Sequence, residues 1–300
     1  MTSRYARITG IGDEGGASLM TQLSNHRALG WDSIELRNVD GRNICEIGDG
    51  EFDSARGILE EEGFRTAGLG SAIANWARPI GTPFEKDLVD LRRSIPRAKS
   101  LGTKFIRIMS YPNDGRPEPD WRREVFRRMG ELVAIAEGEG AVLLHENCDG
   151  WASTSPERQA ELLARFDSPA LMIVFDTGNP ISHGGDPAST WAFYRAAKPR
   201  IAHFHIKDCR RRPDGTVEHV LPGDGECDVE AIMIDLLGSG YRGMFSIEPH
   251  MAVQVHLGGK AAGGVDIGSV YREYGARANR LWDRVAGISS LEPGGRPPLQ

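Results

Sequence analysis

The feature that most constrains the fold is a regular alternation of short apolar segments with longer stretches of helical periodicity. The apolar segments are rich in Ile, Val, Leu and Phe, which is typical of buried strands. They occupy residues 6–12, 32–37, 65–71, 104–110, 141–147, 171–176, 201–208 and 244–249. Strands that alternate with helices pair in parallel, and eight such units favour closure into a barrel over an open sheet. The sequence therefore predicts an α/β fold consisting of a single (β/α)8 barrel, a TIM barrel.

The stretches between these segments have the spacing of apolar residues that is typical of helices. The pattern predicts helices over residues 16–30, 84–102, 120–140, 155–166 and 269–287. Asp120 and Ser155 stand where an N-cap is expected, because their side chains can accept a hydrogen bond from a free N–H of the first turn. Pro156 follows Ser155 at the first helical position, where its missing N–H costs nothing.

The domain organisation is simple, because no internal boundary divides the chain. Residues 1–287 are predicted to form the barrel domain, with a glycine-rich loop at residues 257–269. Residues 288–300 are rich in Pro and Gly and are expected to form a frayed tail.

The composition is that of a soluble globular protein, with 40% apolar and 26% charged residues. The net charge of −6 argues against nucleic acid or an anionic membrane as a partner. No run approaches the ~18 apolar residues of a transmembrane helix, and the N-terminus lacks the apolar core of a signal peptide. Four cysteines, at positions 45, 148, 209 and 227, include no CxxC pair, so free thiols are expected. We therefore expect a cytoplasmic protein with a small-molecule partner, either as a monomer or as a homo-oligomer.

Ionisable side chains end the last four predicted strands. They are Glu146, Asp176, His205 and Glu248, separated by 30, 29 and 43 residues. An interval near 30 is one strand–helix unit, and the carboxyl ends of barrel strands meet on the face that carries active sites. Each residue alone could be a salt-bridge partner or a helix cap. Four such groups in one cleft would repel and desolvate one another without a cation, so the set predicts one shared divalent metal ion.

The donor set of three carboxylates and one imidazole also restricts the choice of metal. It suits Mn²⁺, Mg²⁺ or Co²⁺ with one or two positions left open. We expect Mn²⁺ first, with Mg²⁺, Co²⁺ and Zn²⁺ as alternatives, although a structural zinc would prefer thiolates and a closed site.

Two further histidines lie on the predicted strands. His203 precedes His205 by two residues and so shares its face, where it is expected one layer deeper as a core or supporting residue. His145 precedes Glu146 and should face the helices, unless the strand has already ended and the imidazole can reach the substrate.

Four other histidines lie outside the predicted strands and helices. His183 follows Asp176 and His250 follows Glu248, so both are candidates for substrate contact. His219 and His256 are expected at the surface.

Other polar and aromatic residues near the strand ends are candidates for substrate binding. Lys207 and Arg211 follow the metal histidine and could bind substrate oxygens or a phosphate, or could be solvated charges. Arg107 lies within a strand and is either functional or salt-bridged. Trp76 could stack on a sugar ring or anchor its loop. Glu35 ends the second strand, where it could reach the substrate or orient the neighbouring Arg37.

Five short motifs resemble those of a known family. They are HEN at 145–147, FDTGN at 175–179, HFHIKD at 203–208, PGDGECD at 222–228 and SIEPH at 246–250. In this order they resemble the xylose-isomerase-like TIM-barrel superfamily, and more closely its sugar phosphate isomerase/epimerase branch, near the ketose 3-epimerases and inosose-type enzymes. The resemblance covers the whole barrel and implies the same fold and metal site.

The resemblance implies roles for particular residues. The family's metal ligands fall on Glu146, Asp176, His205 and Glu248, which agrees with the strand-end prediction. In the similar ketose 3-epimerases the two glutamates are also the acid/base pair. An arginine six residues after the metal histidine contacts the sugar there, and Arg211 has this place. Those enzymes carry a histidine three residues after the metal aspartate, where this chain has Asn179.

Three function classes follow from these observations. The first is a metal-dependent isomerase or epimerase acting on a sugar, keto-sugar or cyclitol through a stabilised enolate. The second is a lyase that uses the same enolate to expel a β-leaving group, as in keto-inositol dehydration or cleavage of 3-keto-glycosides. The third is a non-catalytic sugar-binding barrel, which would have no need of two opposed carboxylates. DNA endonuclease IV shares the fold, but it needs three zinc ions and more strand-end histidines, and the acidic chain argues against it.

Overall fold

The computed structural model describes residues 4–252 and 266–291, with side chains as far as residue 287. Eight strands form one sheet in the order β1-β12-β9-β8-β7-β6-β5-β2, and all their pairings are parallel. The strands are β1 (Ile8–Gly10), β2 (Ser33–Leu36), β5 (Arg65–Gly70), β6 (Phe105–Ser110), β7 (Val142–Gly150), β8 (Leu171–Asp176), β9 (Ile201–Ile206) and β12 (Phe245–Ile247). A parallel bridge between Ile11 and Glu35 joins the two ends of this order. The sheet is thus nearly closed, and the predicted (β/α)8 barrel is confirmed.

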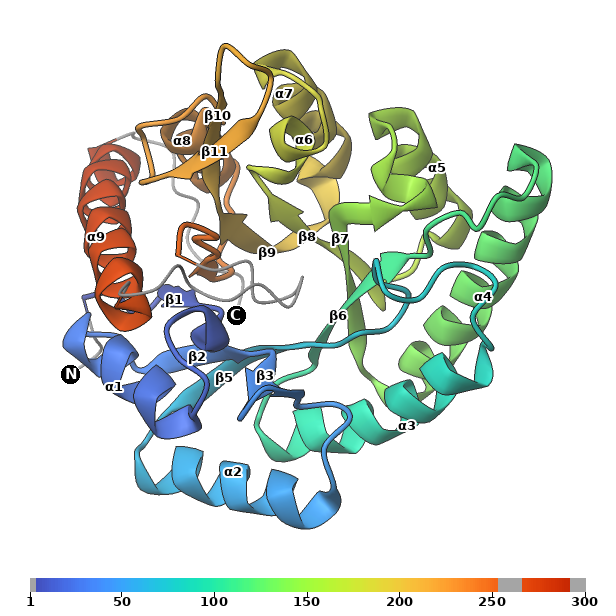
Figure 1. Cartoon of the computed structure of the whole chain (residues 1–300), viewed down its shortest axis with the longest axis horizontal. Helices are drawn as coiled ribbons and strands as arrows, with labels where there is room; N and C mark the ends of the chain where they lie inside the picture. Colours follow the sequence, from blue (N-terminus) through green and yellow to red (C-terminus); the bar gives the residue numbers. More distant parts are fainter. Residues whose placement is uncertain (1–3, 253–265, 292–300) are drawn as a thin grey trace.

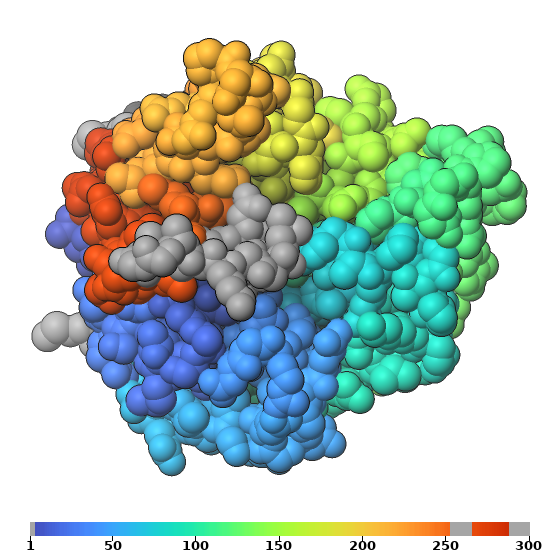
Figure 2. All heavy atoms as spheres, in the orientation of Figure 1, coloured from blue at the N-terminus to red at the C-terminus, as the bar shows by residue number. Residues whose placement is uncertain are grey.

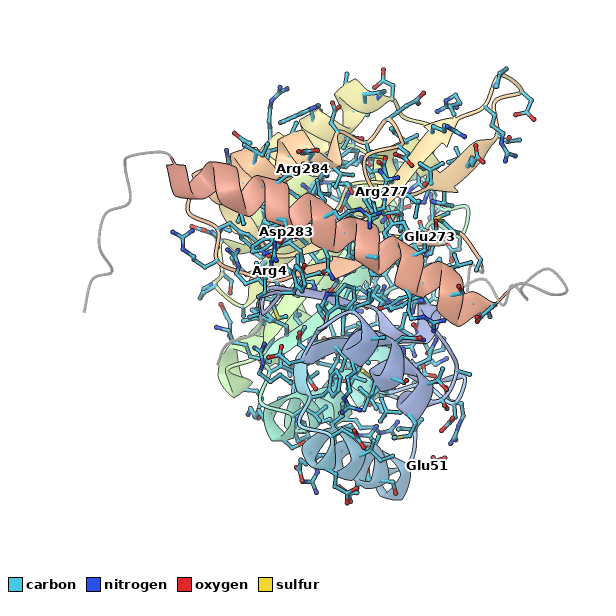
Figure 3. All side chains as sticks on the ribbon, turned by 90° about the vertical axis from the view of Figure 1, so that its left-hand side faces the viewer. Arg4, Glu51, Glu273, Arg277, Asp283 and Arg284 are labelled. Atoms are coloured by element: carbon cyan, nitrogen blue, oxygen red, sulfur yellow. The ribbon has the colours of Figure 1, made fainter. Side chains whose placement is uncertain are left out.

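Helices surround the strands, as Figure 1 shows. They are α1 (Leu19–Ala28), α2 (Asp49–Glu61), α3 (Glu85–Ser100), α4 (Glu118–Glu139), α5 (Pro156–Phe166), α6 (Asn179–Ser182), α7 (Pro187–Ala197), α8 (Val229–Gly238) and α9 (Ile267–Leu291). Three short 3-10 helices, η1 (Gly12–Glu14), η2 (Trp151–Ser153) and η3 (Lys198–Arg200), connect them with the strands. Helix α9 crosses the outside of the barrel in Figure 3, where Arg277 pairs with Asp224 at 3.0 Å and Arg284 with Glu230 at 2.8 Å.

The helix starts show which capping predictions hold. Ser155 caps α5, because its Oγ accepts a hydrogen bond from the Arg158 N–H at 3.3 Å, and Pro156 is the first helical residue. The prediction that Asp120 caps α4 was wrong, since this helix begins at Glu118 after Pro117. Asp120 lies instead in the first turn, where a negative charge favours the helix dipole.

The element boundaries differ from the sequence prediction mainly near the seventh strand. Strand β9 ends at Ile206, and residues beyond it form the antiparallel hairpin β10 (Asp208–Arg211) and β11 (Val217–Val220). The turn contains Gly215 with a φ of 85°, a conformation that glycine adopts without strain. A second hairpin, β3 (Asn38–Val39) and β4 (Arg42–Asn43), follows β2.

The C-terminal region was predicted only in part. Helix α9 continues to Leu291, so residues 288–291 are helical rather than part of a frayed tail. Most of the predicted glycine-rich loop, together with His256 and residues 292–300, lies outside the described residues. In the part of the chain that the structure describes, no helix is long and apolar enough to cross a membrane.

The alternation of side chains along the strands separates two apolar layers. The large core lies between the sheet and the helices. A small cluster of Val142, Leu144 and Val174 lies on the opposite side of the strands. Glu146 follows Val142 and Leu144 at steps of two, and Asp176 follows Val174 in the same way, so these carboxylates continue the inner face. The barrel interior therefore has an apolar floor with a polar layer above it, near the carboxyl ends of the strands.

Candidate functional site

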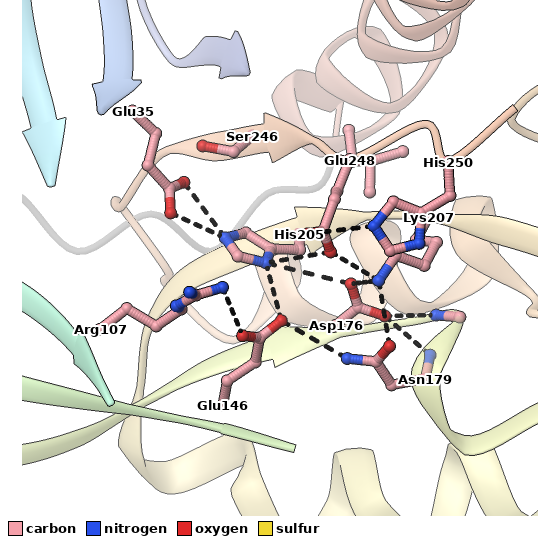
Figure 4. Close-up of polar contacts among 12 residues, drawn as sticks. Glu35, Arg107, Glu146, Asp176, Asn179, His205, Lys207, Ser246, Glu248 and His250 are labelled. Carbon is pink, nitrogen blue, oxygen red and sulfur yellow. Dashed lines mark hydrogen bonds and ion pairs between the residues drawn. The ribbon is translucent and has the colours of Figure 1, made fainter. Parts of the chain in front are cut away.

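The four predicted ligands converge at one place in the barrel. Each offers one donor atom, and these atoms lie within 4.8 Å of one another. The His205 Nδ1 is 3.3 Å from Glu146 Oε1, 3.9 Å from Asp176 Oδ2 and 4.0 Å from Glu248 Oε2. All four side chains are almost completely buried. Figure 4 shows them pointing toward one another from β7, β8, β9 and the residue that follows β12.

The orientation of the His205 ring is determined by Glu35. The His205 Nε2 lies 3.1 Å from both carboxylate oxygens of Glu35. His203 Nε2 lies 2.8 Å from the same carboxylate and 2.8 Å from the Ser246 hydroxyl. An N–H donated by Nε2 to Glu35 leaves the lone pair of Nδ1 directed at the cluster, which is the arrangement found around metal-bound histidines. Glu35 therefore supports His205 and His203 from below, and the alternative that it orients Arg37 was wrong.

Asp176 is held by the start of α6. Its Oδ1 accepts hydrogen bonds from the backbone N–H groups of Gly178 and Asn179, at 2.8 and 2.7 Å. The other oxygen, Oδ2, remains directed at the cluster. Gly178 is required by packing, because a Cβ there would lie 2.5 Å from the Lys207 side chain. This contact gives a physical reason for the glycine of the FDTGN motif.

Lys207 extends into the cluster as a buried cation. Its ammonium nitrogen lies 3.0 Å from Asp176 Oδ2, 2.5 Å from Glu248 Oε2 and 3.0 Å from Asn179 Oδ1. Burial opposes the charged form, but the carboxylates of Asp176 and Glu248 outweigh it and raise the pKa of Lys207 well above its usual value. Lys207 thus compensates part of the negative charge.

The carboxylates differ in their electrostatic surroundings. Burial raises the pKa of Asp176 to about 6, with Glu248 and Glu146 adding to the effect and Lys207 opposing it. For Glu146, burial is outweighed by the Arg107 guanidinium at 3.0 Å and by His205, so its pKa is lowered to about 2. Glu146 is therefore ionised. At Asp176, burial and the neighbouring carboxylates outweigh the Lys207 ammonium, so the ionised form is less favoured there.

Glu248 is positioned by a second set of charged residues. Arg37 donates to Glu248 Oε1 at 2.9 Å and also pairs with Asp13 and Glu14. His250 has its Nε2 3.1 Å from Glu14 and 3.4 Å from Glu248. Its backbone has a φ of 50°, and its N–H donates to Glu14 Oε2 at 2.8 Å. This strained conformation turns the imidazole back over Glu248.

The chemistry of the four donors fits a divalent cation. Among the described buried atoms without a hydrogen bond of acceptable geometry are Asp176 Oδ2, His205 Nδ1 and Glu248 Oε2. The Lys207 ammonium contacts the two oxygens, and the His205 nitrogen faces the Glu146 carboxylate oxygen Oε1 at 3.3 Å. Three carboxylate oxygens and one imidazole nitrogen directed at a common point are suitable ligands for Mg²⁺, Mn²⁺ or Zn²⁺.

A cavity of about 210 Å³ opens onto the cluster. It is lined by Trp76, Arg107, Glu146, Cys148, Asn179, Ser182, His183, Lys207, His219, Glu248 and His250. The structure thus brings most of the predicted substrate-binding residues together. Figure 2, drawn in the orientation of Figure 1, shows that the N-terminal half of the chain, in blue to green, and the C-terminal half, in yellow to red, both contribute to this face of the molecule.

Two predicted substrate contacts lie elsewhere. His145 is buried and does not line the cavity, because β7 continues to Gly150 and the alternation of its side chains directs His145 away from the face of Glu146. Arg211 is exposed on the β10–β11 hairpin and donates to the Gly185 carbonyl at 2.7 Å. Since the strand was predicted to continue to 208, the hairpin that carries Arg211 away from the cavity was not anticipated.

Other site residues were missed. The prediction that His219 lies at the surface was wrong: it lines the cavity, and its ring stands edge-on to that of His250, with centroids 5.2 Å apart. Asp13 and Glu14 directly follow the first predicted strand, residues 6–12, so the strand-end argument applied to that strand would have found them. The partners of Arg37 could not be predicted from the sequence, because Glu14 lies 23 residues and Glu248 lies 211 residues away along the chain.

Residues 23–266 match the Xylose isomerase-like TIM barrel family. The chain belongs to this family. The resemblance inferred from the motifs is thereby confirmed, and the four converging residues lie within the matched range.

The relatives of this chain include an epimerase and several inosose dehydratases. The 2-epi-5-epi-valiolone 7-phosphate 2-epimerase of Actinoplanes sp. is 27% identical over 215 residues, which cover 71% of this chain and 75% of that enzyme. The inosose dehydratase of Bacillus thuringiensis is 24% identical over 145 residues, covering 44% of this chain and 47% of the enzyme. A xylose isomerase-like TIM barrel protein of Mycobacterium smegmatis, solved in complex with magnesium, superposes with a TM-score of 0.67 at 19% identity, covering 93% of this chain and 97% of that one. The family thus includes both epimerases and dehydratases.

Proposed function

We propose that this protein is a divalent-metal-dependent isomerase or epimerase that acts on a keto-sugar or cyclitol through an enolate. The observation that supports this most strongly is the convergence of Glu146 and Glu248. They come from β7 and from the end of β12, and both reach the same His205 nitrogen. Two carboxylates that approach one point from separate strands can act on two faces of a bound substrate.

The metal would be held by Glu146, Asp176, His205 and Glu248. When bound there, it would supply stabilisation of the negative charge that develops on the substrate's carbonyl and neighbouring hydroxyl oxygens during proton removal. The physiological ion remains our prediction, with Mn²⁺ first.

The protein's own residues would move the proton. One of the two glutamates, as the carboxylate, would take the proton from the carbon next to the carbonyl, and the other, as the protonated acid, would give its proton to the opposite face, which inverts the carbon and exchanges the roles of the pair. Return to the adjacent carbon gives the isomer instead. Arg107 and Arg37 hold the two carboxylates in place from outside, since each donates to a carboxylate oxygen of one glutamate.

The residues around the cavity would orient the substrate. Lys207 and Asn179 offer polar atoms beside Asp176, and His250 does so beside Glu248. Trp76 lies over the Arg107 guanidinium, with 5.7 Å between the guanidinium carbon and the ring centroid, at the wall of the cavity. An aromatic ring there can stack on the apolar face of a sugar.

The second candidate is a lyase, because the inosose dehydratases of the family use a related cyclitol substrate. The same enolate would then expel a group from the β-carbon instead of accepting a proton. The residues of the site serve either reaction, so the outcome is decided by the substrate.

The test is incubation of Mn²⁺-loaded protein with a panel of ketoses, inososes and 3-keto-glucosides in D₂O. The proposal predicts deuterium on the carbon next to the carbonyl, together with an epimer or isomer. Loss of water or of the aglycone would support the lyase. Absence of both exchange and product with every compound would contradict the proposed function and favour a binding protein.

A further inference from the structure

A second, larger cavity adjoins the site. It has a volume of about 740 Å³ and lies between the end of β7, η2 and α5 on one side and α6 and α7 on the other. Cys148 and His183 line both this cavity and the smaller one above Glu146. We call the larger cavity the α5–α7 groove. Figure 1 shows α5, α6 and α7 grouped at the same edge of the barrel.

The sizes of the two cavities indicate how a substrate would be divided between them. Pockets that enclose a small-molecule ligand usually measure ~300–1,000 Å³. The cavity above the cluster, at about 210 Å³, is below this range and suits a single ring held against Glu146 and Glu248. A substrate confined to it would leave the adjoining groove unused. A larger substrate could place its reacting ring in the small cavity and a second group in the groove.

The charges of the groove indicate the chemistry of that second group. Its ionisable lining residues are Asp149, Glu157, Asp186, His183 and Cys148, and no Lys or Arg is among the described residues that line it. Hydroxyl and amide groups of Asn147, Ser153, Thr154 and Ser189 accompany them. Carboxylates and hydroxyls of this kind can bind the hydroxyl groups of a sugar, whereas a phosphate inside the groove would meet like charges. Two arginines lie at the rim, where Arg158 donates to the Thr154 hydroxyl at 2.9 Å and Arg211 to the Gly185 carbonyl at 2.7 Å.

Among the residues that the structure describes around the small cavity, no cation is left uncompensated for a phosphate either. The Lys207 ammonium already pairs with Asp176 and Glu248. The Arg107 guanidinium pairs with Glu146 at 3.0 Å. Phosphate recognition normally uses arginines or lysines that are available to the anion. The two cavities together therefore favour an uncharged substrate over a sugar phosphate.

We propose that the substrate is an unphosphorylated keto-glycoside of about disaccharide size, with its reacting ring above Glu146 and an uncharged, hydroxyl-bearing second ring in the α5–α7 groove. This rests on the proposed function, because that function places the reacting ring in the small cavity. It adds the substrate class, and it makes His183 and Cys148 the boundary between the two rings.

The experiment is calorimetric titration of the Mn²⁺-loaded protein with glucose, glucose 6-phosphate and a set of glucose disaccharides, none of which needs to react. At least one disaccharide should bind ten-fold or more tightly than glucose, and glucose 6-phosphate no more tightly than glucose. The variant Ala192→Trp places a large side chain in the groove from α7, and it should remove the advantage of the disaccharide without changing the affinity for glucose.

Two further variants make the result specific. Ala188→Trp, one turn earlier on the same groove wall and more exposed, should act like Ala192→Trp and covers the case in which the latter fails to fold. Ala160→Trp lies on the exposed side of α5, outside the groove, and should bind both sugars as the wild type does.

Tighter binding of glucose 6-phosphate than of every disaccharide would overturn the proposal, as would an undiminished disaccharide advantage in both groove variants. Failure of any disaccharide to bind better than glucose would also overturn it. None of these outcomes bears on deuterium exchange with a small ketose, so the proposed function would be judged separately.

Discussion

Removal of the Glu35 carboxylate should weaken metal binding although all four proposed metal ligands are unchanged. Glu35 is buried beneath the cluster and accepts hydrogen bonds from two imidazoles, at 2.8 Å from His203 and 3.1 Å from His205. Glu35→Gln keeps the shape but replaces one acceptor oxygen by an NH₂ group. One imidazole N–H would then face a donor, so a buried group loses its partner, which costs about 1–3 kcal/mol of stability.

The effect on metal affinity follows from the orientation of His205. A supporting residue of this kind typically contributes 10–100-fold to metal affinity, which corresponds to about 1.4–2.7 kcal/mol. Competition of Mn²⁺ against a chromophoric chelator would measure the affinity, and thermal unfolding in excess chelator would measure the loss of stability in the absence of metal. Glu161→Gln is a suitable control, because Glu161 is an exposed residue of α5 whose ion pair with Arg122 is also exposed. The reasoning is refuted if Glu35→Gln binds Mn²⁺ as tightly as the wild type.

Three other predictions concern catalysis, pH and substrate class. Glu146→Gln and Glu248→Gln should each lower turnover by about 10²–10⁴-fold while much of the metal stays bound, and one of the two should still exchange substrate hydrogen with D₂O; near-normal turnover in both would mean that another residue is the base. His26 is buried, and burial lowers its pKa from 6.5 to about 4. Between these two pH values the unfolded chain takes up a proton that the folded chain does not. The free energy of unfolding should therefore fall by up to about 3 kcal/mol as the pH drops from 6.5 toward 4. Urea unfolding at pH 7 and pH 4.5 should show this loss in the wild type and a smaller one in His26→Gln, and equal losses would contradict it. The Mn²⁺-loaded protein should neither bind duplex DNA at physiological salt nor nick an abasic oligonucleotide, and nicking that requires the metal would contradict the sugar-enzyme proposal.

The parts of the structure that could be predicted from the sequence are those set by repetition. The alternation of apolar segments with segments of helical periodicity is a local signal, and its eight repeats along the chain together indicate a barrel. Because the strand ends of a barrel share one face, the positions of Glu146, Asp176, His205 and Glu248 along the chain were enough to predict that they meet.

The parts that could not be predicted depend on contacts between distant segments. The pairing of Glu35 with His203 and His205 links residues about 170 positions apart. His219 reaches the cavity because it lies on the β10–β11 hairpin, and this hairpin follows the predicted strand in a segment for which no element was predicted. Arg211 shows the same limit from the other side, since a spacing carried over from a family cannot reveal that a hairpin directs the side chain elsewhere.

The central claim is that the four converging residues hold one divalent cation on which activity depends. Elemental analysis of protein purified without chelator tests it most directly, with the variant Asp176→Ala beside the wild type. The account predicts about one divalent ion per wild-type chain, almost none in the variant, and loss of solvent deuterium exchange into substrate when the metal is removed. A wild-type protein that contains no divalent metal and still catalyses the exchange at its full rate would contradict the account.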